Sequence, residues 1–220
     1  MSRTRSSWVP VGLVALALVP VLAGAARLVQ VLGGPPVIPA DPRFTTTPVP
    51  VVLHVAAVIG YTLIGAFQFS ATLRARHPGW HRRAGRVTVG LGLVVALSAL
   101  WLTVVLPRKV GTGDVLHTAR LVVGTAMAAS LVLGLRAIRR RDVTRHRAWM
   151  LRAYALGVGA GTQTLTVGVG SALFGRGVIR TDLMLVAGWV VNLAVAETLI
   201  RRRRRHRVPG NPRHPFPVGA

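Results

Sequence analysis

Four of the seven histidines fall into two matched pairs, and they are the residues in this sequence best suited to chemistry. His54 and His117 each follow a leucine near the start of an apolar stretch, and His81 and His146 are each followed by an arginine. Two imidazoles at one depth on facing helices can serve as the two axial ligands of a b-type haem iron. The spacing therefore predicts a haem b site with His54 and His117 as iron ligands, and His81 and His146 as a second pair.

Other polar residues accompany the first pair. His54, Tyr61 and Gln68 recur at seven-residue steps, which places them in one polar stripe on a helix. Arg120 lies one turn beyond His117, where it could pair with a haem propionate. The same residues also fit a metal or quinone site, a small-solute or proton carrier that uses the stripe, or structural histidines in a non-catalytic scaffold or assembly subunit.

Several kinds of chemistry are excluded by what the sequence lacks. It contains no cysteine, which rules out a thiol nucleophile and iron–sulfur or cysteine-ligated zinc sites. It has no G-x-x-x-x-G-K-[ST] loop, no H-E-x-x-H pair and no G-x-S-x-G elbow. We therefore assign no enzyme class. An electron carrier that works with a quinone or a membrane redox partner stays open, because haem would supply the reactivity.

The composition indicates the environment in which these residues lie. Of 220 residues, 51% are hydrophobic and only 15% are charged, against roughly 25% charged in soluble domains. A membrane-spanning helix needs about 20 mostly apolar residues, and six stretches meet this requirement. The sequence thus predicts an all-α, polytopic membrane bundle. Its predicted spans are 8–32, 49–73, 87–106, 115–135, 148–173 and 182–200.

The basic residues are distributed unevenly about these spans. With a cytoplasmic N-terminus, the inner segments hold 20 of the 28 lysines and arginines, and the outer segments hold 5. The positive-inside rule therefore predicts that both termini are cytoplasmic. The net charge of +23 is then explained by topology and by contact with anionic lipid headgroups rather than nucleic acid. Headgroup contact is also the alternative interpretation of His81 and His146.

Spans two and three resemble spans four and five. The two histidine pairs recur at offsets of 63 and 65 residues, which predicts a duplicated helical hairpin. The expected organisation is a first helix with an outer loop, a four-helix core, a sixth helix and a disordered basic tail. These four parts correspond to residues 1–48, 49–174, 175–200 and 201–220. The first helix could alternatively be a signal peptide cleaved near Ala25.

Two further features have structural explanations. Glu197 lies one turn before Arg201, which predicts an ion pair along the last helix. Span five carries a face of small residues suited to close helix packing. These residues are Ala153, Gly157, Gly161, Thr164 and Gly168.

The residues also resemble a known family. His54, the segment FQFSATLRARHPGWHRRAGR (67–86), His117 and the segment RRDVTRHRAWMLRAYAL (140–156) resemble bacterial predicted membrane proteins grouped as domain of unknown function 2306. The resemblance covers about residues 50–170 and implies a multi-span protein of the bacterial cytoplasmic membrane. It implies no activity. The layout of paired histidines is also similar to that of two-haem b-type cytochromes, by arrangement alone.

Overall fold

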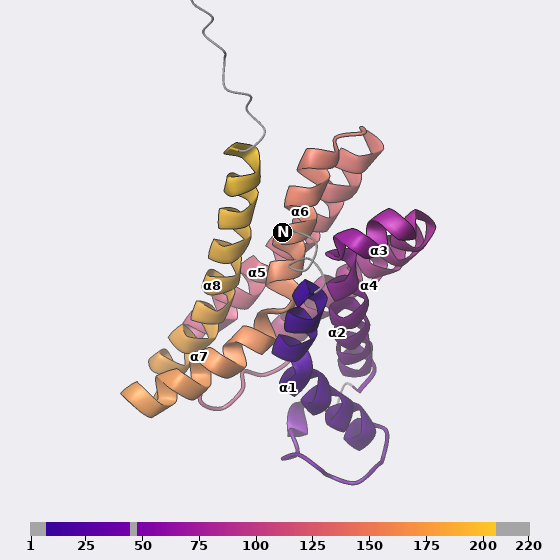
Figure 1. Ribbon diagram of the computed structural model, residues 1–220. Coiled ribbons are helices and arrows are strands. Elements are labelled where there is room, and N and C mark those ends of the chain that lie inside the picture. The colour runs from indigo at the N-terminus through magenta and orange to yellow at the C-terminus, as the bar shows by residue number, and fades with distance from the viewer. Residues whose placement is uncertain (1–7, 45–47, 206–220) are drawn as a thin grey trace, which may run out of the picture.

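The computed structural model describes residues 8–44 and 48–205, which form helices joined by short loops (Figure 1). No strand occurs among these residues, so the predicted all-α class is confirmed. In chain order the elements are α1 (Trp8–Val31), the 3-10 helix η1 (Pro42–Phe44), α2 (Pro48–Gln68), α3 (Ala71–Arg76), α4 (Pro78–Val105), α5 (Asp114–Arg139), α6 (Val143–Gly157), α7 (Gly159–Phe174) and α8 (Val178–Arg205).

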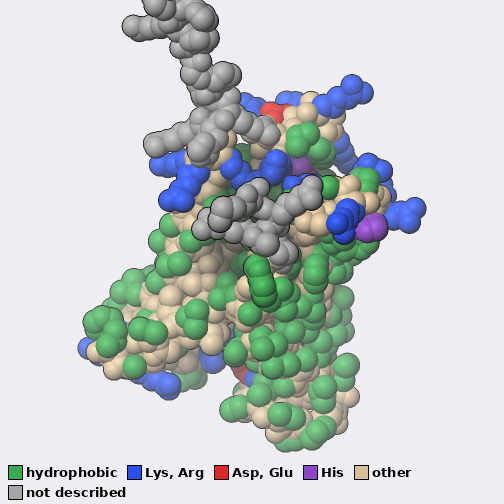
Figure 2. Space-filling model, viewed as in Figure 1, with side chains coloured by type: hydrophobic (Ala, Val, Ile, Leu, Met, Phe, Trp, Pro, Cys, Tyr) green, Lys and Arg blue, Asp and Glu red, His purple; other side chains and the backbone are tan. Residues whose placement is uncertain are grey.

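Five of these helices, α1, α2, α4, α5 and α8, are long and apolar enough to cross a membrane. Their outer faces carry large apolar side chains such as Leu22, Leu97 and Val190, each about 60% exposed. Figure 2 shows apolar side chains over the middle of the molecule and most of the visible basic side chains at its upper end. Apolar surface on this scale is disfavoured in water. The protein is therefore an integral membrane protein.

The fifth predicted span is two helices instead of one. The sequence predicts a single helix over 148–173, but α6 and α7 meet at Val158 and run in different directions (Figure 1). Gly157 and Gly159 flank the break, and glycine is both the weakest common helix former after proline and a frequent kink site. Neither α6 nor α7 reaches the length of a candidate span, so the prediction of six spans is not confirmed.

Side chains of α8 compensate for the break. Asn192 donates from Nδ2 to the carbonyl oxygen of Ala155 at 3.0 Å, and its Oδ1 accepts from the Thr162 hydroxyl at 2.7 Å. Gln163 donates from Nε2 to the carbonyl of Leu185 at 2.8 Å. Backbone groups left unpaired in a membrane are costly. These bonds hold α7 against α8 and satisfy the carbonyl that the break exposes.

The closest helix pairs are α2 with α4, α5 with α6, and α7 with α8. The core is formed by buried residues of α2, α4, α5 and α6, and where α2 meets α6 the rings of Tyr61 and Tyr154 lie 5.7 Å apart. A Cβ built on Gly65 of α2 would lie 2.5 Å from the Tyr154 ring, and one on Gly157 of α6 would lie 2.4 Å from the Tyr61 ring. Each helix thus packs its tyrosine onto the other's glycine. The predicted duplication of a helical hairpin is not confirmed, since the second copy contains the broken span five.

Several helices extend beyond their predicted ends. Proline at the first position suits a helix start, and α4 begins at Pro78 rather than 87. Asp142 caps α6, accepting from the Arg145 N–H at 2.9 Å. His81 and His146 therefore lie on helices. The last helix continues to Arg205, so the predicted tail loses its first five residues to α8, and its remainder, 206–220, lies outside the described residues.

The ion pair predicted for Glu197 is wrong in its partner. Glu197 binds Arg152 of α6 through two bonds, Nε to Oε1 at 2.5 Å and Nη2 to Oε2 at 3.1 Å. The Arg152 guanidinium also lies 4.7 Å from the centre of the Trp149 ring. The prediction considered only neighbours along one helix, whereas α6 packs directly against α8. The pair of Glu197 with Arg152 therefore joins α8 to α6.

Candidate functional site

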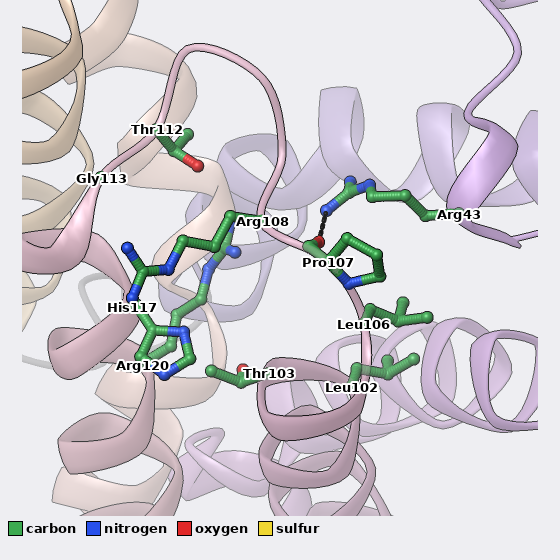
Figure 3. A pocket seen from close by; sticks show the side chains of 10 residues that line it. All are labelled: Arg43, Leu102, Thr103, Leu106, Pro107, Arg108, Thr112, Gly113, His117 and Arg120. Carbon is green, nitrogen blue, oxygen red and sulfur yellow. Dashed lines mark hydrogen bonds between the residues drawn. The ribbon is translucent and has the colours of Figure 1, made fainter.

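A polar pocket lies at the end of the bundle where α4 ends and α5 begins (Figure 3). It encloses about 20 Å³, which is room for one water-sized group. Four basic side chains line it, and they come from η1, the α4–α5 loop and α5: Arg43, Arg108, His117 and Arg120. We call it the His117 pocket, and we call the two ends of the bundle the His117 end and the His146 end.

The loop that forms one wall of the pocket is held by an acid from a distant part of the chain. Asp182, in the first turns of α8, is only 1% exposed. Its carboxylate accepts the backbone N–H of Gly113 at 3.0 Å on both oxygens and that of Leu116 at 3.0 Å. A carboxylate here also complements the positive end of the α5 dipole. Asp182 thus caps α5 from another helix and fixes Gly113 at the pocket wall.

Two of the four basic groups are neutralised by carboxylates. Arg43 pairs with Asp41 at 2.5 Å and also donates to the carbonyl of Pro107 at 3.2 Å. The hydrogen bond from Arg43 lowers the pKa of Asp41 below its ordinary value, so the carboxylate stays charged. Arg108 pairs with Asp114 at 2.6 Å, in an ion pair that is largely exposed.

The other two basic groups have no such partner. Among the described residues, neither Arg120 nor His117 has a hydrogen bond or an ion pair to its side chain. The charge of Asp182 attracts Arg120 from a distance, but its two oxygens already accept backbone N–H groups. Both side chains point into the pocket (Figure 3). The His117 pocket therefore holds a cationic group that lacks an acceptor.

The structure does not bring His54 and His117 together. His54 is bound through Nδ1 to the Ser98 hydroxyl of α4 at 2.9 Å. Helix α4 packs against both α2 and α5, whereas α2 and α5 have almost no contact. Joint ligation of one haem iron by these two imidazoles therefore stays a prediction.

The predicted polar stripe on α2 is one face, and that face packs against α4. His54 contacts Ser98, the Tyr61 ring lies against Gly92, and the Gln68 side chain lies against Gly85. The three α4 residues recur at six- and seven-residue steps in the reverse order, as expected for antiparallel helices. The stripe is therefore a packing seam with small residues opposite each polar one.

The second histidine pair lies at the opposite end of the bundle. His146 is bound through Nδ1 to the carbonyl of Gly134 on α5 at 2.9 Å. His81 lies on α4, within range of the charges of Arg74, Arg82 and His146. No group of three or more histidine or acidic side chains that could hold a metal occurs in the described part of the chain.

Sequence reasoning did not assign Asp182 or Arg43 to the site. The sequence did offer one signal for Asp182, which is the first residue of the last predicted span, where a carboxylate needs a hydrogen-bonding or charged partner. That partner is the backbone at the start of another helix, which no spacing rule within the sequence reveals.

The family described as "Predicted membrane protein (DUF2306)" matches the chain over residues 51–200. The match takes in the two segments that contain the histidine–arginine pairs and most of α8. Comparison with curated proteins and with solved structures gives no match.

Proposed function

We propose that this chain, which belongs to the DUF2306 family of predicted membrane proteins, binds a small anion in the His117 pocket. The observation that carries the proposal is Arg120. Its guanidinium points into the pocket and has no acceptor among the described residues. A partly buried cation without a partner is costly, and a bound anion would remove that cost.

The size and chemistry of the pocket limit the ligand. About 20 Å³ admits a halide or one oxygen of a carboxylate, and little more. Guanidinium and imidazole N–H groups both donate to such oxygens. We therefore propose a halide or a small carboxylate, bound between Arg120 and His117.

The position of the pocket bears on its use. The distribution of basic residues predicts that the His117 end lies outside the cytoplasm of a bacterial cell and that both chain termini lie inside. Span five is broken at Val158, and broken helices are a recurring feature of carriers. We extend the proposal to uptake of the bound anion, with the pocket as the external binding site.

Haem b is the second candidate, with an electron-carrier role beside a quinone or a membrane redox partner. It is favoured by the free His117 imidazole with Arg120 one turn away, in the relation predicted for a ligand and a propionate partner. It is opposed by the bond between His54 and Ser98 and by the small volume of the pocket. Oxidised and dithionite-reduced spectra of protein expressed with added haem decide it. A Soret band lost in His117→Ala would establish haem, and its absence would end this candidate.

The anion proposal is tested by titrating purified protein with bromide and with acetate, using thermal stability and calorimetry. We expect saturable stabilisation that is weakened at least about tenfold in Arg120→Gln, the loss of a charged hydrogen bond. Arg176→Gln is the matched control, because Arg176 is an exposed arginine at the same end of the bundle. Equal responses in the wild type and both variants would overturn the proposal. A folded protein with neither anion nor haem binding would favour the scaffold or assembly subunit.

A further inference from the structure

A second and much larger cavity lies beside the end of α1, near the His117 pocket. It encloses about 290 Å³, close to the lower limit of the roughly 300–1,000 Å³ of small-molecule pockets. Its walls come from the end of α1, the loop that follows, η1 and the first residue of α2 (Figure 1). We call it the α1–α2 cavity. Four of the residues that line it are apolar: Val31, Ala40, Phe44 and Pro48.

Two polar side chains of α1 line this cavity and hold the loop beside it. Arg27 donates from Nη1 to Oε1 of Gln30 and from Nη2 to the carbonyl of Pro39 at 2.9 Å. Gln30 donates from Nε2 to the carbonyl of Ile38 at 3.2 Å. The Arg27 guanidinium also lies 5.4 Å from the centre of the Phe44 ring. The cavity is therefore built by specific contacts between α1, the loop and η1.

The charge of Arg27 is not neutralised by the residues around it. A guanidinium has five N–H groups, and Arg27 uses two of them, both toward neutral acceptors. Asp41, the acid that lines the cavity, accepts three bonds from Arg43 instead, including one from Nε at 2.8 Å. Among the described residues, Arg27 has no ion pair. The cavity thus combines apolar walls with a half-buried cation that lacks an anionic partner.

The depth of the cavity in the membrane indicates where its ligand comes from. Helix α1 has 24 residues, which span about 36 Å, against about 30 Å for the hydrocarbon core of a bilayer. Arg27 lies four residues before the end of this helix, so its charge lies close to the boundary between acyl chains and headgroups. At this boundary a lipid presents an acidic head to a cation and its chain to an apolar wall.

We propose that the α1–α2 cavity binds a membrane-soluble amphiphile with an acidic head. The head accepts hydrogen bonds from the free N–H groups of Arg27, and the first part of the acyl chain packs against Val31, Ala40 and Phe44. Carboxylate and phosphate oxygens both accept from guanidinium, so the head belongs either to a free fatty acid or to an anionic phospholipid. The site uses other residues than the anion site between Arg120 and His117 and does not depend on it.

The decisive variant is Ala40→Leu, which fills part of the cavity and leaves the bonds of Arg27 and Gln30 in place. Ala40 is exposed, so we expect this variant to fold. We expect decanoate binding to weaken at least about tenfold in Ala40→Leu, and similarly in Arg27→Gln, which removes the charge. Ala25→Leu is the matched control, because it makes the same substitution at an exposed position of α1 that does not line the cavity. Arg120→Gln should leave decanoate binding unchanged.

Three probes test the acidic head and identify its source, with thermal stability as the readout. Decanoate and decanol, which share one chain length, are titrated into detergent-purified protein below their micellar concentrations. Phosphatidylglycerol is added in phosphatidylcholine nanodiscs. Stabilisation by decanoate or by phosphatidylglycerol that is weakened in Ala40→Leu and kept in Ala25→Leu supports the site, and the more effective probe identifies the source.

Two results would overturn the proposal. If decanol stabilised the protein as well as decanoate did, the acidic head would have no role. If Ala40→Leu responded as the wild type does, the ligand would not occupy the cavity, even where Arg27→Gln had lost the response. Should Arg27→Gln fail to fold because Arg27 also holds the loop, the comparison of Ala40→Leu with Ala25→Leu decides.

Discussion

Asp182 should contribute more to stability than any other acid at the His117 end. Its Oδ2 accepts the backbone N–H groups of both Gly113 and Leu116, and its Oδ1 also accepts that of Gly113. Asparagine keeps only one of these oxygens and places a buried amide donor, which has no acceptor there, beside the backbone N–H groups. One buried unpaired N–H costs about 1–3 kcal/mol, and loss of the charge at the helix N-terminus adds roughly 0.3–1 kcal/mol. We therefore expect Asp182→Asn to lower the free energy of unfolding by about 1.5–4 kcal/mol.

The assay is thermal unfolding in detergent, followed by tryptophan fluorescence. Asp114→Asn is the control, because Asp114 begins the same helix but its side chain is 82% exposed and its ion pair with Arg108 lies at the surface. Exposed pairs contribute about 0–1 kcal/mol, so this variant should unfold nearly as the wild type does. Removing the negative charge that attracts Arg120 should also strengthen bromide binding by Asp182→Asn. Equal unfolding temperatures for the two variants would refute the capping role.

Two other predictions concern different parts of the bundle. Asn192→Leu removes two interhelical hydrogen bonds at the break in span five, those to Ala155 and Thr162. Such bonds contribute about 0.6–1.7 kcal/mol each in membrane proteins, so we expect the free energy of unfolding to fall by about 1–3 kcal/mol. We also expect faster amide hydrogen exchange at the start of α7. Unchanged exchange there would show that the break does not rely on Asn192. Asp41→Asn should lower thermal stability at neutral pH, because Arg43 holds the pKa of Asp41 below its ordinary value of 3.8. A carboxyl group whose pKa is lowered on folding stabilises the fold at pH values above its unfolded pKa. The difference in thermal stability from the wild type should therefore persist from pH 8 to about 5. It should disappear as the pH falls below the pKa of Asp41 in the folded protein. A difference that is the same at pH 8 and pH 3 would contradict this.

The helical class and most of the spans could be predicted because hydropathy depends on local composition. The same applies to the polar stripe on α2, where seven-residue spacing correctly placed three residues on one face. The role of the stripe could not be predicted, since it depends on Ser98, Gly92 and Gly85 of α4 lying opposite.

The break in span five shows the limit of composition. The predicted face of close packing is confirmed at Gly157 and Gly161, which meet Tyr61 and Leu16 closely, but a Cβ built on Gly168 would meet nothing within 4 Å. The same glycines also weaken the helix, and whether it breaks depends on Asn192, a residue of another helix.

The candidate site was predicted in part. Arg120 and His117 do lie together in a pocket, as their spacing indicated. The position of His54 relative to this pocket could not be predicted from its depth in the membrane. Two residues at one depth lie close together only if their helices pack against each other, and α2 and α5 each pack mainly against other helices.

The most direct test of the central claim is a crystal structure of the protein with bromide, using anomalous scattering to locate the ion. The proposal predicts an anomalous peak between Arg120 and His117, and no such peak in crystals of Arg120→Gln grown with the same salt. Peaks confined to exposed arginines such as Arg176, with none in the pocket, would contradict the proposed anion site.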